Sequence, residues 1–90
     1  MEKKTKVLRC SSSTDANKLS GSIYSVFQES SETEIIIRVI GAGALNQAIK
    51  AVIISNKFFA KKGYYLAVKP SFQDTVDSMT AIELKIIFLS

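Results

Sequence analysis

The chain has 90 residues, of which 47% are hydrophobic and 22% are charged, and its formal net charge is +4 from 12 Lys+Arg against 8 Asp+Glu. This length predicts one domain, residues 1–90, and the apolar fraction argues against disorder. The sequence contains no His and one Cys, which excludes an intrachain disulfide, a zinc cluster and a histidine general base. The mild basic excess permits a polyanionic partner without requiring one.

The start of the chain and its apolar runs predict a cytoplasmic protein that makes no membrane contact. The basic stretch at residues 1–10 has no apolar core of signal-peptide length behind it. Apolar runs such as "AVII" and "IIFL" are far shorter than the roughly 20 residues that a membrane-spanning helix needs. A single cysteine also fits a reducing compartment.

The first half of the chain predicts a strand, an amphipathic helix and a second strand. Residues 6–10 form a β candidate, and the cluster "SSSTD" that follows supplies N-cap residues. Over residues 16–30 the apolar side chains recur at the spacing of one helical face: Leu19, Ile23, Val26 and Phe27. Residues 34–40 are apolar on both faces except at Arg38, which shares a face with Ile36 and Ile40. We therefore expect no helix above that face of the sheet.

The second half predicts a helix followed by two strands. Over residues 43–56 one arc is apolar, formed by Leu45, Ala48, Ile49, Val52 and Ile53. On the other side, Asn46, Lys50 and Lys57 fall within about 40° of one another at 3.6 residues per turn. Ile54 interrupts this polar stripe, and a contact with a second subunit would explain it. Residues 63–69 form a strand that Pro70 should end, and residues 80–89 form the last strand.

The predicted order β-α-β-α-β-β indicates an α+β fold. The β-α-β portion suits parallel strands, and the final two strands suit a hairpin. Two helices on one face of a four-stranded mixed sheet, a two-layer sandwich, is the simplest arrangement that buries the apolar faces.

The segment "GAG", Gly41 to Gly43, joins the second strand to the second helix and allows three interpretations. A dinucleotide-binding loop is disfavoured, because Asn46 occupies the third glycine position and no acidic residue follows at the required place. A structural interpretation is that both glycines adopt backbone angles that a Cβ would forbid, and taken alone the motif favours it. A binding interpretation is that free N–H groups at the helix N-terminus attract an anion. Three side chains on the first turn and a half would then bind phosphate or sugar oxygens: Asn46, Gln47 and Lys50.

The segment "VIGAGALNQAIKAV", residues 39–52, resembles the stage V sporulation protein S family, and "LSGSI", "KPSFQD" and "TAIELKII" extend the resemblance along the chain. That family is similar in fold to the Alba nucleic-acid-binding proteins. The resemblance implies an Alba-like fold and a homodimer that forms through the side of the second helix. It also implies contact with DNA or RNA through three regions: the loop before the first helix, the glycine turn and the last hairpin.

The resemblance, together with the polar stripe and the uncovered sheet face, gives a set of candidate nucleic-acid-binding residues: Arg38, Gly41, Gly43, Asn46, Gln47, Lys50 and Lys57. Two regions depart from the family pattern. The first loop, residues 11–14, has Ser13 where the family tends to place Lys. The hairpin, residues 72–80, carries Asp74 and Asp77, with Met79 where Arg is common. Both departures remove positive charge that would meet a phosphate backbone.

These observations predict a small, non-enzymatic, dimeric protein that regulates a sporulation-type programme by binding DNA or RNA. The alternative is a protein-interaction or assembly module that keeps the fold without binding nucleic acid. An enzyme or small-molecule sensor at the glycine turn is disfavoured, and we predict no catalytic residue, no metal site and no cofactor. The sequence leaves the choice between DNA and RNA open.

Overall fold

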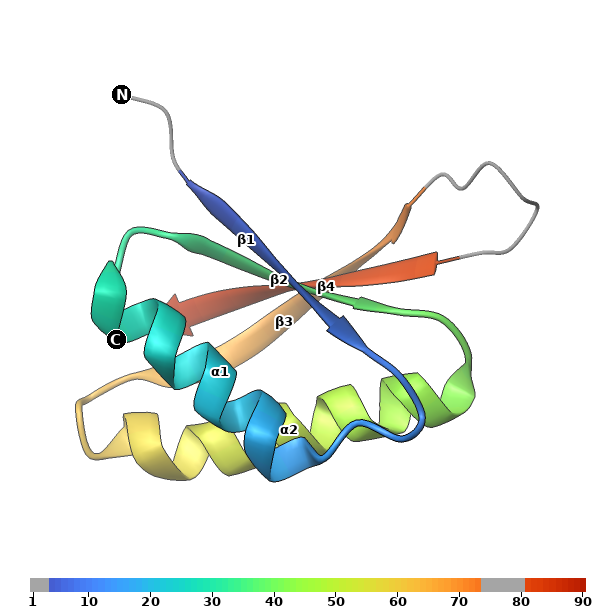
Figure 1. The fold of residues 1–90 in the computed structure, drawn as a ribbon. Helices are drawn as coiled ribbons and strands as arrows, with labels where there is room; N and C mark the ends of the chain where they lie inside the picture. The colour runs from blue at the N-terminus through green and yellow to red at the C-terminus, as the bar shows by residue number, and fades with distance from the viewer. Residues whose placement is uncertain (1–3, 74–80) are drawn as a thin grey trace.

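The computed structural model describes residues 4–73 and 81–90 and confirms the predicted α+β architecture. The elements follow the predicted order (Figure 1): β1 (Thr5–Cys10), α1 (Ala16–Glu29), β2 (Glu34–Val39), α2 (Ala42–Ala60), β3 (Tyr65–Gln73) and β4 (Ala81–Leu89). The four strands form one mixed sheet in the order β1-β2-β4-β3. β1 is parallel to β2, and β4 is antiparallel to both β2 and β3. β1 and β3 are therefore the two edge strands.

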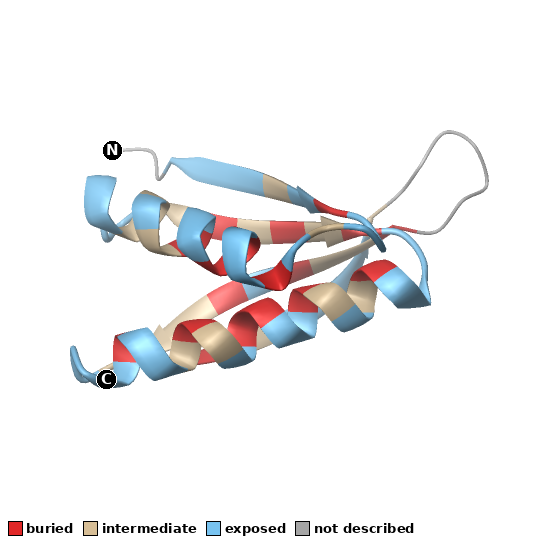
Figure 2. Ribbon diagram, turned by 60° about the horizontal axis from the view of Figure 1, so that its bottom comes forward, coloured by how far each residue is buried: buried red, intermediate tan, exposed pale blue. Residues whose placement is uncertain are grey.

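Both helices lie on the same face of the sheet, as Figure 2 shows, and the buried residues gather between the two layers. Along β2, Ile35, Ile37 and Val39 are buried beneath the helices, whereas Ile36 and Arg38 alternate with them on the other face. The predicted uncovered face is confirmed. Arg38 donates there to Glu83 at 3.1 Å, so the ion pair satisfies its charge locally.

Small side chains let the two helices approach closely. The residues of α2 that are buried recur at helical spacing: Ala44, Ala48, Ala51, Val52, Ser55 and Phe59. Most of them are alanine or serine, which leave room for α1. The hydroxyls of Ser20 and Ser55 are 2.9 Å apart and buried, so each satisfies the other inside the core.

An aromatic cluster fills the end of the core beneath the C-terminus of α2. The ring of Phe59 is fully buried, and its centroid is 5.6 Å from Tyr24, 5.0 Å from Phe27 and 5.2 Å from Phe88. The prediction that the helix ends near Asn56 is wrong for this reason. Phe59 continues the buried arc two turns after Val52, so packing carries the helix on to Ala60.

β3 runs through Pro70 to Gln73, and the prediction that Pro70 ends this strand is wrong. The side chain of Asn56 binds the outward-facing backbone of Leu66, accepting from its N–H at 2.7 Å and donating to its C=O at 3.3 Å. Pro70 lies four residues further along the strand, so its nitrogen also faces the free edge. A proline at that position removes no hydrogen bond from the sheet.

Candidate nucleic-acid interface

The glycine turn begins α2 without a side-chain cap. Gly41 is the N-cap residue, with φ 94° and ψ 158°, a backbone region that is essentially restricted to glycine. The N–H of Leu45 donates to the C=O of Gly41 at 3.1 Å and closes the first turn. Within the described residues no side chain bonds to the N–H groups of this turn, and residues 41–43 are exposed. The predicted conformational role of Gly41 is confirmed, and the turn presents bare N–H groups to solvent.

Gly43 is required for a different reason from the predicted one. Its φ is not positive, because it lies within the first turn of α2, so the predicted forbidden backbone angle is wrong here. A Cβ built on Gly43 would lie 2.8 Å from the Cβ of Ser12, which is closer than real Cβ contacts. Glycine at this position therefore lets the loop before α1 pack directly on the start of α2.

That loop is held in place by its own hydroxyls and by an N-cap. The N–H of Ser11 donates to the hydroxyl of Thr14 at 2.8 Å. The carboxylate of Asp15 accepts from the N–H groups of Asn17 at 2.8 Å and Lys18 at 3.3 Å. The N-terminus of α1 is thus occupied by a carboxylate of its own chain, whereas the adjacent N-terminus of α2 is uncapped.

Gln47 joins this loop to α2. Its side-chain nitrogen donates to the C=O of Thr14 at 2.8 Å, and it is half-buried. Asn46 is exposed and donates to the side-chain oxygen of Gln47 at 3.5 Å. Gln47 therefore fixes the position of the loop, and Asn46 has the side-chain amide that solvent reaches.

Lys50 is exposed one turn after Asn46 and lines a shallow depression between α2 and the N-terminus of α1. The depression is lined by Ser13, Thr14, Asp15, Ala16, Asn17, Gln47, Lys50, Ile53 and Ile54. Ile54 is half-buried and packs against the core of its own chain. The expected subunit contact is therefore not needed to explain it.

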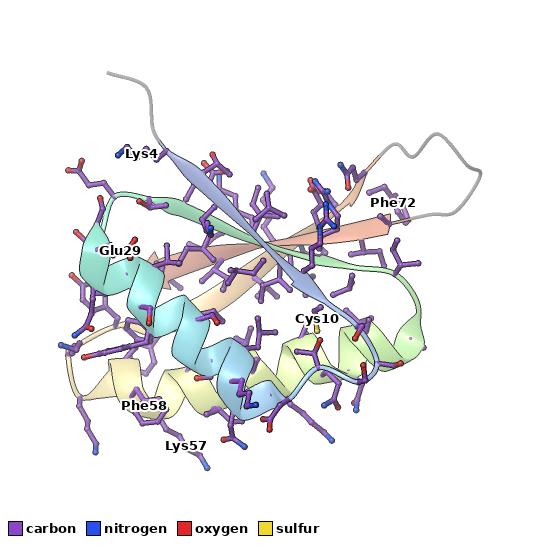
Figure 3. All side chains as sticks on the ribbon, viewed as in Figure 1. Lys4, Cys10, Glu29, Lys57, Phe58 and Phe72 are labelled. Carbon is purple, nitrogen blue, oxygen red and sulfur yellow. The ribbon has the colours of Figure 1, made fainter. Side chains whose placement is uncertain are left out.

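The structure does not bring Arg38 or Lys57 to the glycine turn. Arg38 lies on the sheet face opposite the helices and is paired with Glu83. Lys57 follows Gly41 by 16 residues, which is about 24 Å along the helix axis at 1.5 Å per residue. Figure 3 shows Lys57 and Phe58 projecting from the C-terminal part of α2. The angular grouping of Lys57 with Asn46 and Lys50 is correct, but the axial rise separates them.

The predicted hairpin contact is described only at its start. Phe72 is the second-last residue of β3 and 77% exposed. Asp74, Asp77 and Met79 lie outside the described residues.

Cys10 contributes to the turn through packing. Its Sγ donates to the C=O of Ala44 at 3.3 Å, so the end of β1 is held over the first turn of α2. Burial raises the pKa of the Cys10 thiol, and its contact with Thr14 lowers it by less. The thiol is therefore protonated near neutral pH and is a poor nucleophile. Cys10 is thus a small buried residue of the core.

Sequence reasoning missed three exposed apolar side chains on α2: Ile49, Ile53 and Phe58. The helical positions of Ile49 and Ile53 assigned them to the buried arc. In the structure, the buried arc of α2 is rotated around the helix axis by roughly one residue from the predicted arc, because the alanines and Ser55 face the core. The small residues between the isoleucines were the available signal, since close helix packing needs them.

Two further features are missing from the part of the chain that the structure describes. No helix among residues 4–73 and 81–90 is long and apolar enough to cross a membrane. In the same ranges, no three side chains of Cys, Asp or Glu gather as potential metal ligands.

One family comparison covers almost the whole chain. The model of the family described as stage V sporulation protein S matches residues 6–88. The matched range contains the first loop and the glycine turn. It also contains both helices and all four strands, except the first residue of β1 and the last residue of β4.

Proposed function

The chain belongs to the stage V sporulation protein S family, and we propose that it is a sporulation-type regulator that binds DNA or RNA through the glycine turn. The observation that carries the proposal is the uncapped and exposed N-terminus of α2, followed about 8 and 14 Å along the helix axis by the exposed side chains of Asn46 and Lys50. Family membership supports the sporulation-type role, and the geometry of the turn supports the choice of ligand.

Electrostatics favour an anion at this turn. The aligned peptide dipoles of a helix place about half a positive charge at its N-terminus. α2 carries two lysines and no acidic residue over its 19 residues, so no carboxylate of the helix competes for this charge. Backbone N–H groups and one ammonium bind phosphate oxygens without selecting a base. Binding of this kind is independent of sequence and sensitive to salt.

We propose that the protein is not an enzyme. The sequence has no His, and the single thiol is buried with a raised pKa. The two described ion pairs, Arg38–Glu83 and Lys85–Glu34, lie on the uncovered sheet face and join opposite charges across neighbouring strands. Such pairs support the sheet.

We also propose a homodimer that forms through the side of α2 next to β3. Ile49 is 38% exposed and Ile53 is 55% exposed. Ile49 lies within about 20° of Asn56 around the helix, and Asn56 bonds to the free edge of β3, while Ile53 is one turn after Ile49. Phe72 alternates in register with Leu66, so it lies on the helix side of that edge strand. Exposed apolar side chains gathered along one flank are typical of a subunit interface. Ile53→Asp should give a monomer by sedimentation or light scattering, whereas Val7→Asp on the opposite face should not.

The alternative function, a protein-interaction module, is favoured by one observation. The loop that the family would use for a phosphate contact carries Ser13, whose hydroxyl lies 3.0 Å from that of Ser11. A serine hydroxyl in this loop supplies no charge, so one expected contact region is neutral.

Binding to DNA and RNA of random sequence at two salt concentrations separates the two functions. The wild-type protein should bind at low salt and lose most of its affinity at high salt. Lys50→Glu should abolish binding, whereas Lys69→Glu makes the same charge change on the sheet face away from the helices and should leave most of it. If neither nucleic acid binds even at low salt, the nucleic-acid function is rejected and the interaction module is favoured.

A further inference from the structure

A surface pocket of about 510 Å³ lies between α1 and the C-terminal end of α2, far from the glycine turn along the helix. It is lined by Ser20, Gly21, Tyr24, Phe58, Lys61 and Lys62. Ser20 is buried, and its hydroxyl is bonded to Ser55. A Cβ added to Gly21 would meet no atom within 4 Å, so the absence of a side chain there keeps the pocket open.

Phe58 gives the pocket an exposed aromatic ring. The neighbouring Phe59 is fully buried in the aromatic cluster, whereas Phe58 is 52% exposed. The core does not need the Phe58 ring, which projects from the end of α2 (Figure 3). An exposed aromatic ring beside an opening is a platform on which a planar group stacks.

Two ammonium groups border the same pocket. Lys62 places its Nζ 5.5 Å from the centroid of the Tyr24 ring, a cation–π contact that restrains the side chain. The ion pairs of the described residues are Arg38–Glu83 and Lys85–Glu34, so neither Lys61 nor Lys62 is paired with a described carboxylate. The helix dipole accounts for lysines at a C-terminal end, but it does not account for the exposed ring and the open glycine beside them.

The lysines also continue a series that begins at the glycine turn. At 3.6 residues per turn, Lys50, Lys57 and Lys61 fall within about 40° of one another around α2. A polymer with one negative charge per residue matches such a series better than a single anion does. The structure therefore offers phosphate partners along the helix and an aromatic pocket where the series ends.

We infer that this pocket binds an unpaired nucleobase, which stacks on Phe58 while Lys57, Lys61 and Lys62 bind the adjacent phosphates. The inference rests on the proposed nucleic-acid function and adds to it a preference for single-stranded segments. The pocket is on the α1 flank of α2, whereas Ile49 lies within about 20° of Asn56 around the helix, and Asn56 bonds to β3. A dimer formed through the β3 flank therefore leaves the pocket accessible.

The test compares three labelled DNA probes: a blunt duplex, the same duplex with a short single-stranded thymidine extension, and the same extension made abasic. The wild-type protein should bind the thymidine extension about 5- to 150-fold more tightly than the abasic one, which corresponds to about 1–3 kcal/mol of stacking per base. Phe58→Ala and Gly21→Leu should remove this preference and leave binding to the blunt duplex unchanged. Ser22→Leu adds the same side chain to an exposed position of α1 that does not line the pocket, and should keep the preference.

Gly21→Leu is expected to fold, because it replaces a glycine at an exposed position of α1 where an added Cβ meets open space. Circular dichroism and a thermal melt check this. Equal binding of thymidine and abasic extensions by the wild type would overturn the pocket inference alone. A preference that survives in both pocket variants would also overturn it. Polyglutamate that competes as well as the thymidine extension would show that charge alone is recognised. Failure to bind any of the three probes would overturn the proposed function as well.

Discussion

The N-terminal end of α2 is held by backbone geometry and hydrogen bonds, whereas its C-terminal end is held by aromatic packing. At the first end, Gly41 takes a conformation open to glycine alone, and Gln47 ties the neighbouring loop to the helix. At the second end, Phe59 is in contact distance of three other rings. α2 thus begins with small residues and exposed polar groups, and it ends with large aromatic residues.

The difference separates the aromatic packing that stabilises the fold from the uncapped N–H groups that are free to bind an anion. Buried aromatic rings contribute much of the stability of the core, and their packing offers no free polar group to a ligand. Small residues at the other end contribute little apolar burial, but they leave helix N–H groups exposed to solvent. Substitutions in the buried aromatic cluster should therefore lower the free energy of unfolding more than substitutions at the glycine turn do.

The largest effect is expected for Phe59→Ala. Removing a fully buried ring leaves a cavity among Tyr24, Phe27 and Phe88, so the free energy of unfolding should fall by about 3–5 kcal/mol. Urea unfolding measures the change. Phe58→Ala is the matched control, because that ring is half exposed, and its cost should stay below about 1 kcal/mol. Equal costs would contradict the assignment of Phe59 to the core and Phe58 to the surface.

Gly41→Ala should destabilise the protein by about 1–3 kcal/mol, because an alanine at φ 94° and ψ 158° is strained. Gly21→Ala places the same methyl group inside α1, where it meets open space, and should stabilise by about 0.5–1 kcal/mol. Thermal or urea unfolding of the two variants should give opposite signs. A stable Gly41→Ala protein would mean that the turn adopts another conformation.

Gly43→Ala should also destabilise, by about 1–3 kcal/mol, because the new Cβ would overlap with Ser12. Unlike the backbone strain at Gly41, this steric overlap can be removed by a second substitution. Ser12→Gly removes the Cβ that the methyl group would meet at 2.8 Å, so the double variant should recover most of the loss. A double-mutant cycle by urea unfolding measures the coupling. Strictly additive costs would show that the loop does not pack on Gly43.

Gln47→Ala should have the smallest effect on stability, about 0.5–1.5 kcal/mol for one hydrogen bond to the C=O of Thr14. The loss should be local, because the loop before α1 is released while the aromatic end is unchanged. Hydrogen exchange should therefore speed up for residues 11–15 and stay constant around Phe59. Uniform acceleration across the chain would contradict a local role for Gln47.

The fold was predictable because apolar residues recur at helical spacing over residues 16–30 and 43–56, between segments with the composition of strands. Residues 34–39 are apolar on both faces, and Arg38 alone marked the uncovered one. The predicted ends of α2 and β3 were both too early, and the two errors share a cause. Pro70 and the polar residues after Ile54 are local signals for ending an element, and tertiary packing overrides them at an edge strand and in an aromatic core.

The candidate site was predictable only in part. The dihedral requirement at Gly41 follows from sequence type and position, since a strand that turns directly into a helix favours a glycine. The contact between Gly43 and Ser12 and the bond between Gln47 and Thr14 join segments about 30 residues apart. A single sequence gives no such pairing. Lys57 was grouped by its angle around the helix, and the rise along the axis shows that it belongs with Lys61 and Phe58 instead.

The salt dependence of nucleic-acid binding tests the central claim, that the open end of α2 binds phosphate, most directly. The slope of log affinity against log salt concentration should be shallower by about 1 for Lys50→Gln than for the wild type, because one phosphate contact is lost. Lys69→Gln, which removes the same charge from the far face of the sheet, should leave the slope unchanged. Identical slopes for the wild type and Lys50→Gln would contradict the claim.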